Sequence, residues 1–422
     1  MTTANLPNTP YRGSLIDRLQ QAGRTIQMVF RLTLFTIFKV TIGRRSKAQL
    51  IEKARRGSLI DLTMFSFPGP GPRYEIYPKD QAADMRPDAT VPNRKSRAMA
   101  KETYPEPVYP FKWSEPPVSG NVINGLGETE RRRPLKVFHS GNFSSPWAAM
   151  EWYFYTLNPF RSFWAINRAQ MDNLRLTGPV SPHSVIPEDP AAAAVMVKQA
   201  ARECGATLVG ITHMRDELYF DGVDLDYKYA IAVAIPMDRE TMLQAPGEET
   251  LNHVMDIYVD VSRVAVDLAE RIRSAGHDAR ACTNLGDGAN TVQQVPLAIE
   301  TGLGQLGKHG SIITKDFGSN VRLATVLTNL PLEVDEPEDI GVDDFCATCQ
   351  ICVTNCPPHA IFDTKQMVRG DEKWYVNFDR CAPYFSENGG CAICIEVCPW
   401  SEPGRGSVIS EKMLARRKLE TQ

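Results

Sequence analysis

Hydrophobic positions follow two different periods in turn between residues 190 and 330. Helical spacing covers 191–204 and 254–275, and these segments stop at Gly205 and Gly276. A further helix is predicted to begin near Pro296. Apolar runs of strand length occupy 206–212, 229–237, 278–282, 311–314 and 321–327. Helices and strands in alternation predict an α/β core, which we place at residues 186–335.

Residues 14–42 also have helical spacing and contain an apolar run from Met28 to Ile42, interrupted by Arg31 and Lys39. The run has 15 residues, whereas a membrane-spanning helix needs about 20. Residues 1–60 carry eleven Lys/Arg and two Asp/Glu, a net charge of +9 in a chain of net charge −3. Two interpretations stay open: a basic helix lying in a membrane interface, and a helix packed on the protein's own body.

The remaining N-terminal region, residues 61–185, is rich in proline and aromatic residues. Its proline-rich part, 67–120, predicts an extended arm or linker. Aromatic residues crowd 145–180, where we prefer core packing over the wall of a cavity for a large planar cofactor. At the other end, residues 406–422 form a tail that we expect to finish as a frayed helix.

Length and composition describe an ordinary globular protein. The 422 residues suffice for two or three domains, with 43% hydrophobic and 23% charged residues. The net charge of −3 gives no general case for binding nucleic acid. Function must therefore come from specific motifs.

Eight of the ten cysteines fall in two runs, each closed by a proline. The first run holds Cys346, Cys349, Cys352 and Cys356, and the second holds Cys381, Cys391, Cys394 and Cys398. The first has the spacing of the bacterial ferredoxin run, whose fourth cysteine ligates the other cluster. We therefore predict two [4Fe-4S] clusters in a small α+β ferredoxin-like domain at residues 336–405. Cluster A would take Cys346, Cys349, Cys352 and Cys398, and cluster B would take Cys381, Cys391, Cys394 and Cys356.

Zinc and disulfides are the alternative uses of these cysteines. Tetrahedral zinc sites use pairs of C-x2-C rather than a triple run. Disulfides require an oxidising compartment, and no secretory signal stands in the sequence. The two remaining cysteines, Cys204 and Cys282, are expected to be small buried hydrophobic residues.

The segment GLGQLGKHG, residues 302–310, is the second concentration of unusual residues. It lacks both the nicotinamide-type order G-x-G-x-x-G and the spacing of a phosphate-binding loop. We expect its glycines to let the backbone approach a bulky planar ligand; these are Gly302, Gly304, Gly307 and Gly310. No D-x-H-x-x-G motif is present to supply a histidine ligand to a corrinoid.

Residues 290–332 together with the two cysteine runs resemble corrinoid-dependent reductive dehalogenases, and the resemblance covers about 190–402. Epoxyqueuosine reductases share the GLG-x-x-GK pattern but carry an acidic residue upstream. Here 291–294 contains no acid, and Pro296 lies six residues before Gly302. The resemblance implies a nitroreductase-like core that binds base-off cobalamin. It also implies that Tyr258 donates a proton and that Arg322 stabilises a tyrosinate or a departing halide.

Three further expectations follow. Asn284 is a weaker pocket candidate, while core packing for Tyr258 and an edge-strand surface position for Arg322 remain the alternatives to catalysis. The expected reaction replaces a carbon-bound halogen by hydrogen, with electrons from an external ferredoxin, flavodoxin or reductase. Alternatives are a corrinoid or iron–sulfur reductase of a non-halogenated substrate, such as an epoxyqueuosine reductase, and an electron-transfer subunit. Without the usual export signal, we expect a cytoplasmic protein, either free or in peripheral contact with the inner membrane.

Overall fold

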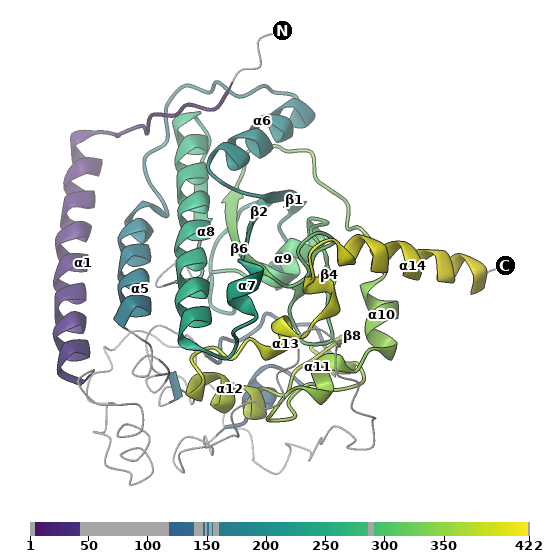
Figure 1. Cartoon of the computed structure of the whole chain (residues 1–422). Coiled ribbons are helices and arrows are strands. Elements are labelled where there is room, and N and C mark those ends of the chain that lie inside the picture. The colour runs from purple at the N-terminus through teal and green to yellow at the C-terminus, as the bar shows by residue number, and fades with distance from the viewer. Residues whose placement is uncertain are drawn as a thin grey trace.

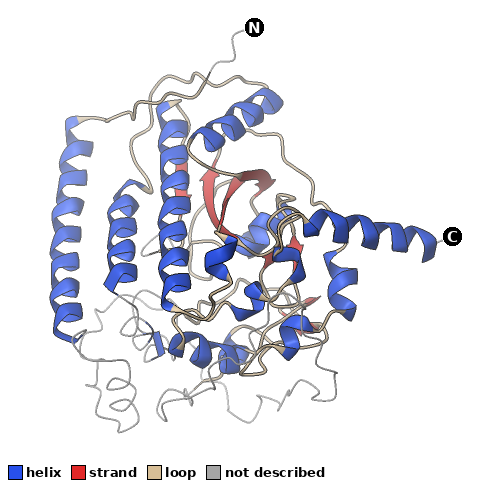
Figure 2. Ribbon diagram, viewed as in Figure 1, coloured by secondary structure: helices blue, strands red, loops and turns tan. Residues whose placement is uncertain are grey.

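The computed structural model describes residues 5–42, 118–138, 147, 150–151, 154, 160–285 and 291–420. The proline-rich arm expected at 67–120 therefore lies almost wholly outside the described residues, as does most of the basic segment beyond residue 42. The described residues form a mixed α/β body and a cysteine-rich C-terminal region (Figures 1 and 2).

A four-stranded antiparallel sheet forms the centre of the α/β body, in the order β1-β2-β6-β3. Its strands are β1 (Leu208–His213), β2 (Tyr229–Pro236), β3 (Ala279–Cys282) and β6 (Val321–Thr328). All four lie where the apolar runs predicted strands. The alternation of elements did not indicate their direction, because the helices between β2 and β3 join strands that are not neighbours. Strand β6 lies between them.

Helices cover this sheet and complete the core (Figure 1). They are α6 (Pro190–Glu203), α8 (Glu248–Ser274) and α9 (Gln294–Glu300). The short helix α7 (Arg239–Met242) packs against α8, and η3 (Asn173–Arg175) and η4 (Asp216–Leu218) are short 3-10 turns. The α6 helix begins at Asp189, whose carboxylate accepts the Ala192 N–H at 3.1 Å. The predicted apolar face of α8 is buried in its second half, including Leu268 and Ile272 at 0% exposure. Its first half faces the C-terminal region instead.

Two more helices lie beside α8, and Figure 1 shows the three side by side. They are α1 (Leu15–Ile42) and α5 (Phe160–Asp172). The α1 helix forms the outer edge and is exposed along most of its described length. None of the helices in the described ranges is both long enough and apolar enough to cross a membrane.

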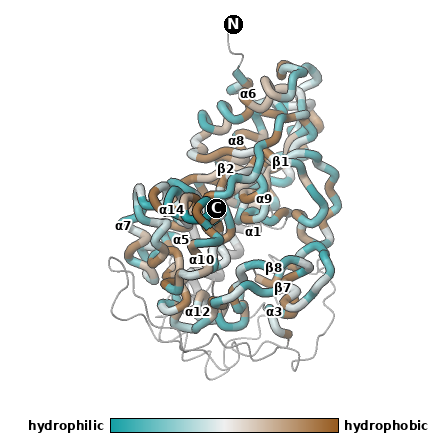
Figure 3. Tube along the Cα trace, turned by 90° about the vertical axis from the view of Figure 1, so that its right-hand side faces the viewer, coloured by the Kyte–Doolittle hydropathy of each residue, from teal (hydrophilic) through white to brown (hydrophobic). Residues whose placement is uncertain are grey.

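The C-terminal region is built from short elements around the cysteines. They are α10 (Val342–Thr348), α11 (Ile351–Thr354), β7 (Gln366–Val368), β8 (Asp371–Lys373), α12 (Phe378–Glu387), α13 (Ile393–Glu396), η6 (Pro399–Ser401) and α14 (Arg405–Glu420). The C-terminal tail is thus helical through Glu420, and Arg417 forms ion pairs with Asp339 and with Asp344 of α10. Figure 3 shows β7, β8, α12 and α3 (Gly120–Ile123) gathered at the end of the molecule opposite α6.

The aromatic-rich segment contributes to the core wherever it is described, as we expected. Trp147 meets Phe378 of α12 edge to face, with ring centres 4.9 Å apart, and Phe154 stacks on Phe385 at 5.2 Å. Nearby, the Asp379 carboxylate accepts the Gly120 N–H at 2.7 Å. The region before the α/β body is therefore attached to the cysteine-rich region through α12.

Candidate active site and metal centre

The cysteine thiols form two groups that cross between the two sequence runs. Burial raises the pKa of Cys398, and the neighbouring Cys346 and Cys349 raise it further. Burial also raises the pKa of Cys352, and Cys398 is the thiol that raises it most. Cys398, at the end of the second run, therefore lies among the first three cysteines of the first run, which is the set predicted for cluster A.

The second group likewise combines cysteines from both runs. Burial raises the pKa of Cys381, and among the other thiols Cys356 raises it most and Cys394 next. Burial raises the pKa of Cys391, and the thiols of Cys394, Cys381 and Cys356 raise it further. Cys356, the fourth cysteine of the first run, is thus grouped with the second run, as predicted for cluster B.

The donor set and its surroundings fit iron–sulfur ligation. All ten cysteines are free thiols, so none is consumed by a disulfide. The Cys356 sulfur accepts the Ala360 N–H at 3.3 Å, the kind of backbone hydrogen bond that steadies a charged sulfur. Burial raises the pKa of Cys346 and of Cys394 to about 12, so metal binding must displace their protons. Among the described residues, no three His, Cys, Asp or Glu side chains converge on one metal ion; a cubane instead spreads its thiolates over four irons.

Tyr258 and Arg322 come together at the boundary between the α/β body and the cysteines. The Arg322 guanidinium carbon lies 4.9 Å from the centre of the Tyr258 ring. Arg322 is half-buried on β6, opposite Ile235 of β2. Within the described sheet, β3 pairs with residues 325–328 of β6, so Arg322 has a paired strand on the β2 side alone and the edge-strand alternative stays open. Tyr258 is half-buried and packs against a hydrophobic cluster that α5 and α8 share, so a packing role coexists with its contact to Arg322.

The charge of Arg322 also acts on one of the cysteines. Its charge lowers the pKa of Cys394 against the dominant effect of burial. Its Nη1 donates to the Val321 carbonyl at 3.2 Å, while its buried Nε has no hydrogen-bond partner within the described part of the chain. A buried donor of this kind normally finds a partner, so Arg322 offers a hydrogen bond to a bound group.

Asn284 and one residue not predicted from the sequence complete the neighbourhood. Asn284 follows β3 and donates its side-chain amide to the Leu323 carbonyl, one residue beyond Arg322. His253 lies on α8 and accepts the Asp238 N–H at 2.8 Å. Burial lowers the pKa of His253, and the charge of Arg322 lowers it further. A lone histidine on an amphipathic helix gave no sequence signal for this position.

The four glycines of 302–310 are surrounded by protein atoms. A side chain at Gly304 would meet the Ile313 carbonyl, and one at Gly302, whose φ is +75°, would meet the Glu336 carbonyl. Gly307 packs against the Ile313 side chain, and Gly310 packs against Val376. These close approaches explain the glycines within the fold, and their contact with a planar cofactor stays a prediction.

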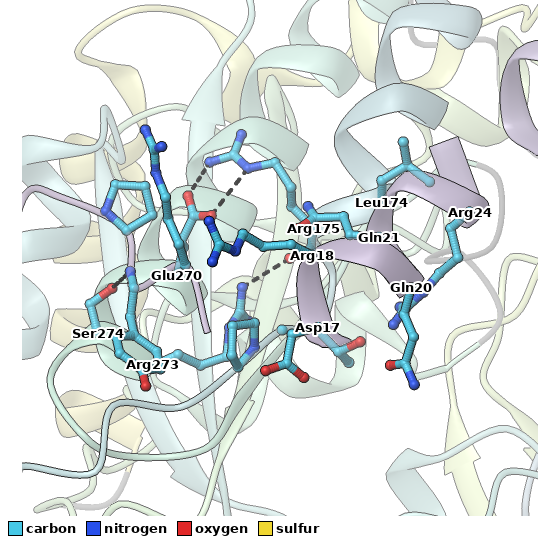
Figure 4. A pocket seen from close by; sticks show the side chains of 16 residues that line it. Asp17, Arg18, Gln20, Gln21, Arg24, Leu174, Arg175, Glu270, Arg273 and Ser274 are labelled. Atoms are coloured by element: carbon cyan, nitrogen blue, oxygen red, sulfur yellow. Dashed lines mark hydrogen bonds and ion pairs between the residues drawn. The ribbon is translucent and has the colours of Figure 1, made fainter. Parts of the chain in front are cut away.

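A separate hollow of about 460 Å³ lies far from these residues (Figure 4). It lies between α1 and the C-terminal end of α8, where Arg175 pairs with Glu270 and the Tyr11 N–H donates to Ser274 at 2.9 Å. Glu270 is twelve residues beyond Tyr258 on the same helix, or about 18 Å along its axis. The hollow therefore lies where α1 packs on the body of the protein and is not part of the candidate active site.

Sequence comparison finds reductive dehalogenases. The chain is 31% identical over 294 residues to the tetrachloroethene reductive dehalogenase of Sulfurospirillum multivorans, covering 58% of each protein. It is 33% identical over 188 residues to that of Desulfitobacterium hafniense, covering 42% of this chain and 33% of the relative. An epoxyqueuosine reductase of Synechocystis is 31% identical over 129 residues, 26% of this chain and 40% of the relative. The chain thus spans between a third and three fifths of these relatives, and no family model matches it.

Solved structures share the fold. A reductive dehalogenase described as B12-dependent superposes with a TM-score of 0.58 at 22% identity, covering 71% of this chain and 46% of that one. A catabolic reductive dehalogenase in complex with 3-bromo-4-hydroxybenzoic acid gives a TM-score of 0.57 at 22% identity, with coverage of 73% and 46%.

Proposed function

We propose that this chain, which is similar to reductive dehalogenases, replaces a carbon-bound halogen of an organohalide by hydrogen. The reaction consumes two electrons and one proton and releases a halide ion. The observation that carries the proposal is the contact of Arg322 with Tyr258, because the same Arg322 charge also lowers the pKa of Cys394, a predicted cluster ligand.

The cofactors of this proposal are two [4Fe-4S] clusters, held by the two thiol groups, and base-off cobalamin. When bound, the clusters supply single electrons and the cobalamin supplies a strongly reducing cobalt centre. Asn284, the unpartnered Nε of Arg322 and the 302–310 segment are the residues that we propose to border the cobalamin. The corresponding units are a nitroreductase-like core at 186–335 and a ferredoxin-like domain at 336–405.

Tyr258 would donate its phenolic proton to the carbon from which the halide departs. A proton donor must be held in place to be efficient, and Tyr258 is held by helix α8 on one side and Arg322 on the other. The phenolate left behind is negative, and a guanidinium that cannot lose its proton stabilises it at short range. Arg322 thus has a role that a lysine or a neutral side chain would fill less well.

We also propose that α1 binds the surface of an anionic membrane. Large apolar side chains are exposed along one stripe of this helix: Leu15, Leu19, Ile26, Val29 and Phe30. They repeat at helical spacing on the side away from Met28, which is buried against the body. Residues 5–42 carry five Lys/Arg and one acid. Apolar exposure on a cationic helix fits a lipid interface with anionic headgroups.

The remaining partners are a small halogenated substrate and an external electron donor, a ferredoxin, a flavodoxin or a reductase. Tetrachloroethene and 3-bromo-4-hydroxybenzoic acid represent the two chemical classes found with the relatives, and we propose an organohalide of one of these classes. Nucleic acid is not among the partners that we propose, and the expected position is the cytoplasmic face of the inner membrane.

Anaerobic reconstitution with iron, sulfide and cobalamin tests the function. The protein is given reduced viologen as electron donor with each of the two halogenated compounds, and halide release and dehalogenated product are measured. We expect a corrinoid absorption spectrum and stoichiometric halide release for at least one compound. Iron–sulfur absorption without corrinoid binding would show an electron carrier instead. Corrinoid binding without halide release from either compound would favour a reductase of another substrate class.

A further inference from the structure

Lys308 is a buried cation beside the first thiol group. Its side chain is 1% exposed, although lysine is almost never fully buried unless its charge is compensated. Its Nζ donates to the Cys349 carbonyl at 3.0 Å and lies 4.8 Å from the centre of the Trp374 ring. No carboxylate forms an ion pair with Lys308 within the ranges that the structure describes. The dipole of a carbonyl and the face of an indole only partly offset the cost of burying an ammonium group.

The backbone of Lys308 approaches the same thiols. Burial raises the pKa of Cys346, whereas the Lys308 backbone N–H and then its side-chain charge lower it. Lys308 is thus directed at Cys346 by its main chain and at Cys349 by its side chain. Both cysteines belong to the group that Cys352 and Cys398 complete.

A second lysine lies near the same indole ring and differs in one respect. The Nζ of Lys365 is 5.7 Å from the centre of the Trp374 ring and 2.7 Å from the Asp343 carboxylate. Asp343 also accepts the Trp374 Nε1–H at 2.9 Å. Lys365 is therefore neutralised by a neighbour and about one third exposed, while Lys308 is buried and directed at the thiols. The pair provides an internal comparison.

We propose that Lys308 is the fixed counter-charge of the cluster held by Cys346, Cys349, Cys352 and Cys398, and that it raises the reduction potential of this cluster. This inference rests on the proposed function, because it needs the cluster to be bound. Four thiolates give a cubane a net negative charge, and each added electron makes the charge more negative. A cation fixed in a low-dielectric interior stabilises the reduced form more than the oxidised form. Lys308 is thus a positioning residue that acts through the cluster.

Redox titration of the reconstituted protein, followed by electron paramagnetic resonance, tests the proposal. Lys308→Gln keeps a hydrogen-bond donor for the Cys349 carbonyl but removes the charge. We expect at least a tenfold lower ratio of reduced to oxidised cluster at a fixed potential, which corresponds to a shift of about 59 mV for one electron. The other cluster should keep its potential. Lys308→Arg, which keeps the charge, should stay close to the parent, and so should the matched control Lys365→Gln.

An unchanged potential in Lys308→Gln with full cluster content would overturn the proposal. So would an equal fall in Lys308→Gln and Lys308→Arg, because it would show a packing role. Lys308→Gln could also fail to hold the cluster. In that case, a cluster retained by Lys308→Arg supports the counter-charge proposal, and loss of the cluster from both variants overturns the proposal. A parent protein that shows no cluster signals after reconstitution refutes the proposed function itself, an outcome distinct from all of these.

Discussion

The guanidinium carbon of Arg322 lies 4.9 Å from the centre of the Tyr258 ring, so a permanent positive charge faces a phenol across two elements distant in sequence. Tyr258 comes from the first half of α8, and Arg322 is the second residue of β6. A cation over an aromatic face is worth about 0.5–2 kcal/mol, depending on solvent exposure. This contact orients the two side chains relative to each other.

Replacing Tyr258 by Phe keeps the ring and its packing but removes the proton. We expect at least a hundredfold lower rate of halide release, the order of magnitude for one general acid, with cluster and corrinoid content unchanged. Tyr229→Phe, on β2, removes a phenolic hydroxyl outside the candidate site and should retain the parent rate. A Tyr258→Phe protein as active as the parent would leave the tyrosine as a packing residue.

Arg322→Gln should also lower the rate of halide release by at least about tenfold, because the charge that stabilises the phenolate is lost. Arg322→Lys restores a charge without the planar guanidinium and should recover only part of the activity. Steady-state rates and absorption spectra of both variants check this. Equal activity of the Gln and Lys variants would show that charge at this position is irrelevant.

The crossed thiol groups predict which cysteine variants resemble each other. The parent should contain about eight irons and eight sulfides, as two cubanes require. Cys356→Ala should lose the cluster of Cys381, Cys391 and Cys394, so its residual paramagnetic resonance spectrum should match that of Cys391→Ala. Cys204→Ala, outside both groups, should retain the full iron content. A Cys356→Ala spectrum that matches Cys352→Ala would show that the two runs bind their clusters without crossing.

The exposed stripe of α1 predicts binding to anionic vesicles. Leu19→Glu combined with Ile26→Glu should weaken partition onto phosphatidylserine-containing vesicles by at least about tenfold, because each change removes apolar contact and adds repulsion. Salt should weaken binding of the parent by screening its arginines. Val195→Glu is the matched control, since Val195 is an exposed apolar residue of α6. Equal sedimentation of the parent and the double variant with vesicles would contradict a lipid surface and leave α1 to a protein partner.

His309 predicts a stability that depends on pH. Burial lowers its pKa to about 4, and its ring is held by the Ser311 N–H at 3.2 Å and the Ser319 hydroxyl at 3.1 Å. The unfolded chain, with a histidine pKa near 6.5, binds this proton more readily. The contribution of His309 is therefore present above about pH 6.5 and is lost as the pH falls toward 4, by about 3 kcal/mol in all.

Unfolding by denaturant under anaerobic conditions, between pH 4 and pH 7.5, measures this effect as a difference between parent and His309→Gln. The variant cannot titrate at this position, so its stability should fall less steeply across the same range. Parallel curves for the two proteins would mean that His309 exchanges its proton without cost to the fold.

The features best predicted from the sequence are those that depend on hydrophobic periodicity and on cysteine spacing. The strands and helices of the α/β body lie where predicted. The grouping of the thiols around Cys398 and Cys356 is consistent with the ferredoxin-type spacing, and cluster ligation stays a prediction. Strand direction could not be predicted, because it depends on which strands become neighbours and not on the pattern within each. The β7–β8 hairpin has three-residue strands with little apolar character, which leaves no periodic signal.

The candidate site shows the same division. Tyr258 and Arg322 were identified from a family resemblance, and their contact is a property of the fold that no local pattern contains. Lys308 was noticed only as part of a glycine-rich motif. Its burial depends on Trp374 and Cys349, which lie 66 and 41 residues later in the chain.

The crossing of the two cysteine runs has a consequence for biosynthesis. Cys398 is the last of the eight cysteines, and it completes the group begun by Cys346, Cys349 and Cys352. The other members of the group of Cys356, which are Cys381, Cys391 and Cys394, are also translated after it. A nascent chain that ends before Cys398 therefore holds three thiols that lack their fourth member. Iron delivery to a complete four-thiol set for the proposed first cluster would therefore follow synthesis of nearly the whole protein, when η6 and α14 are the described elements still to be made.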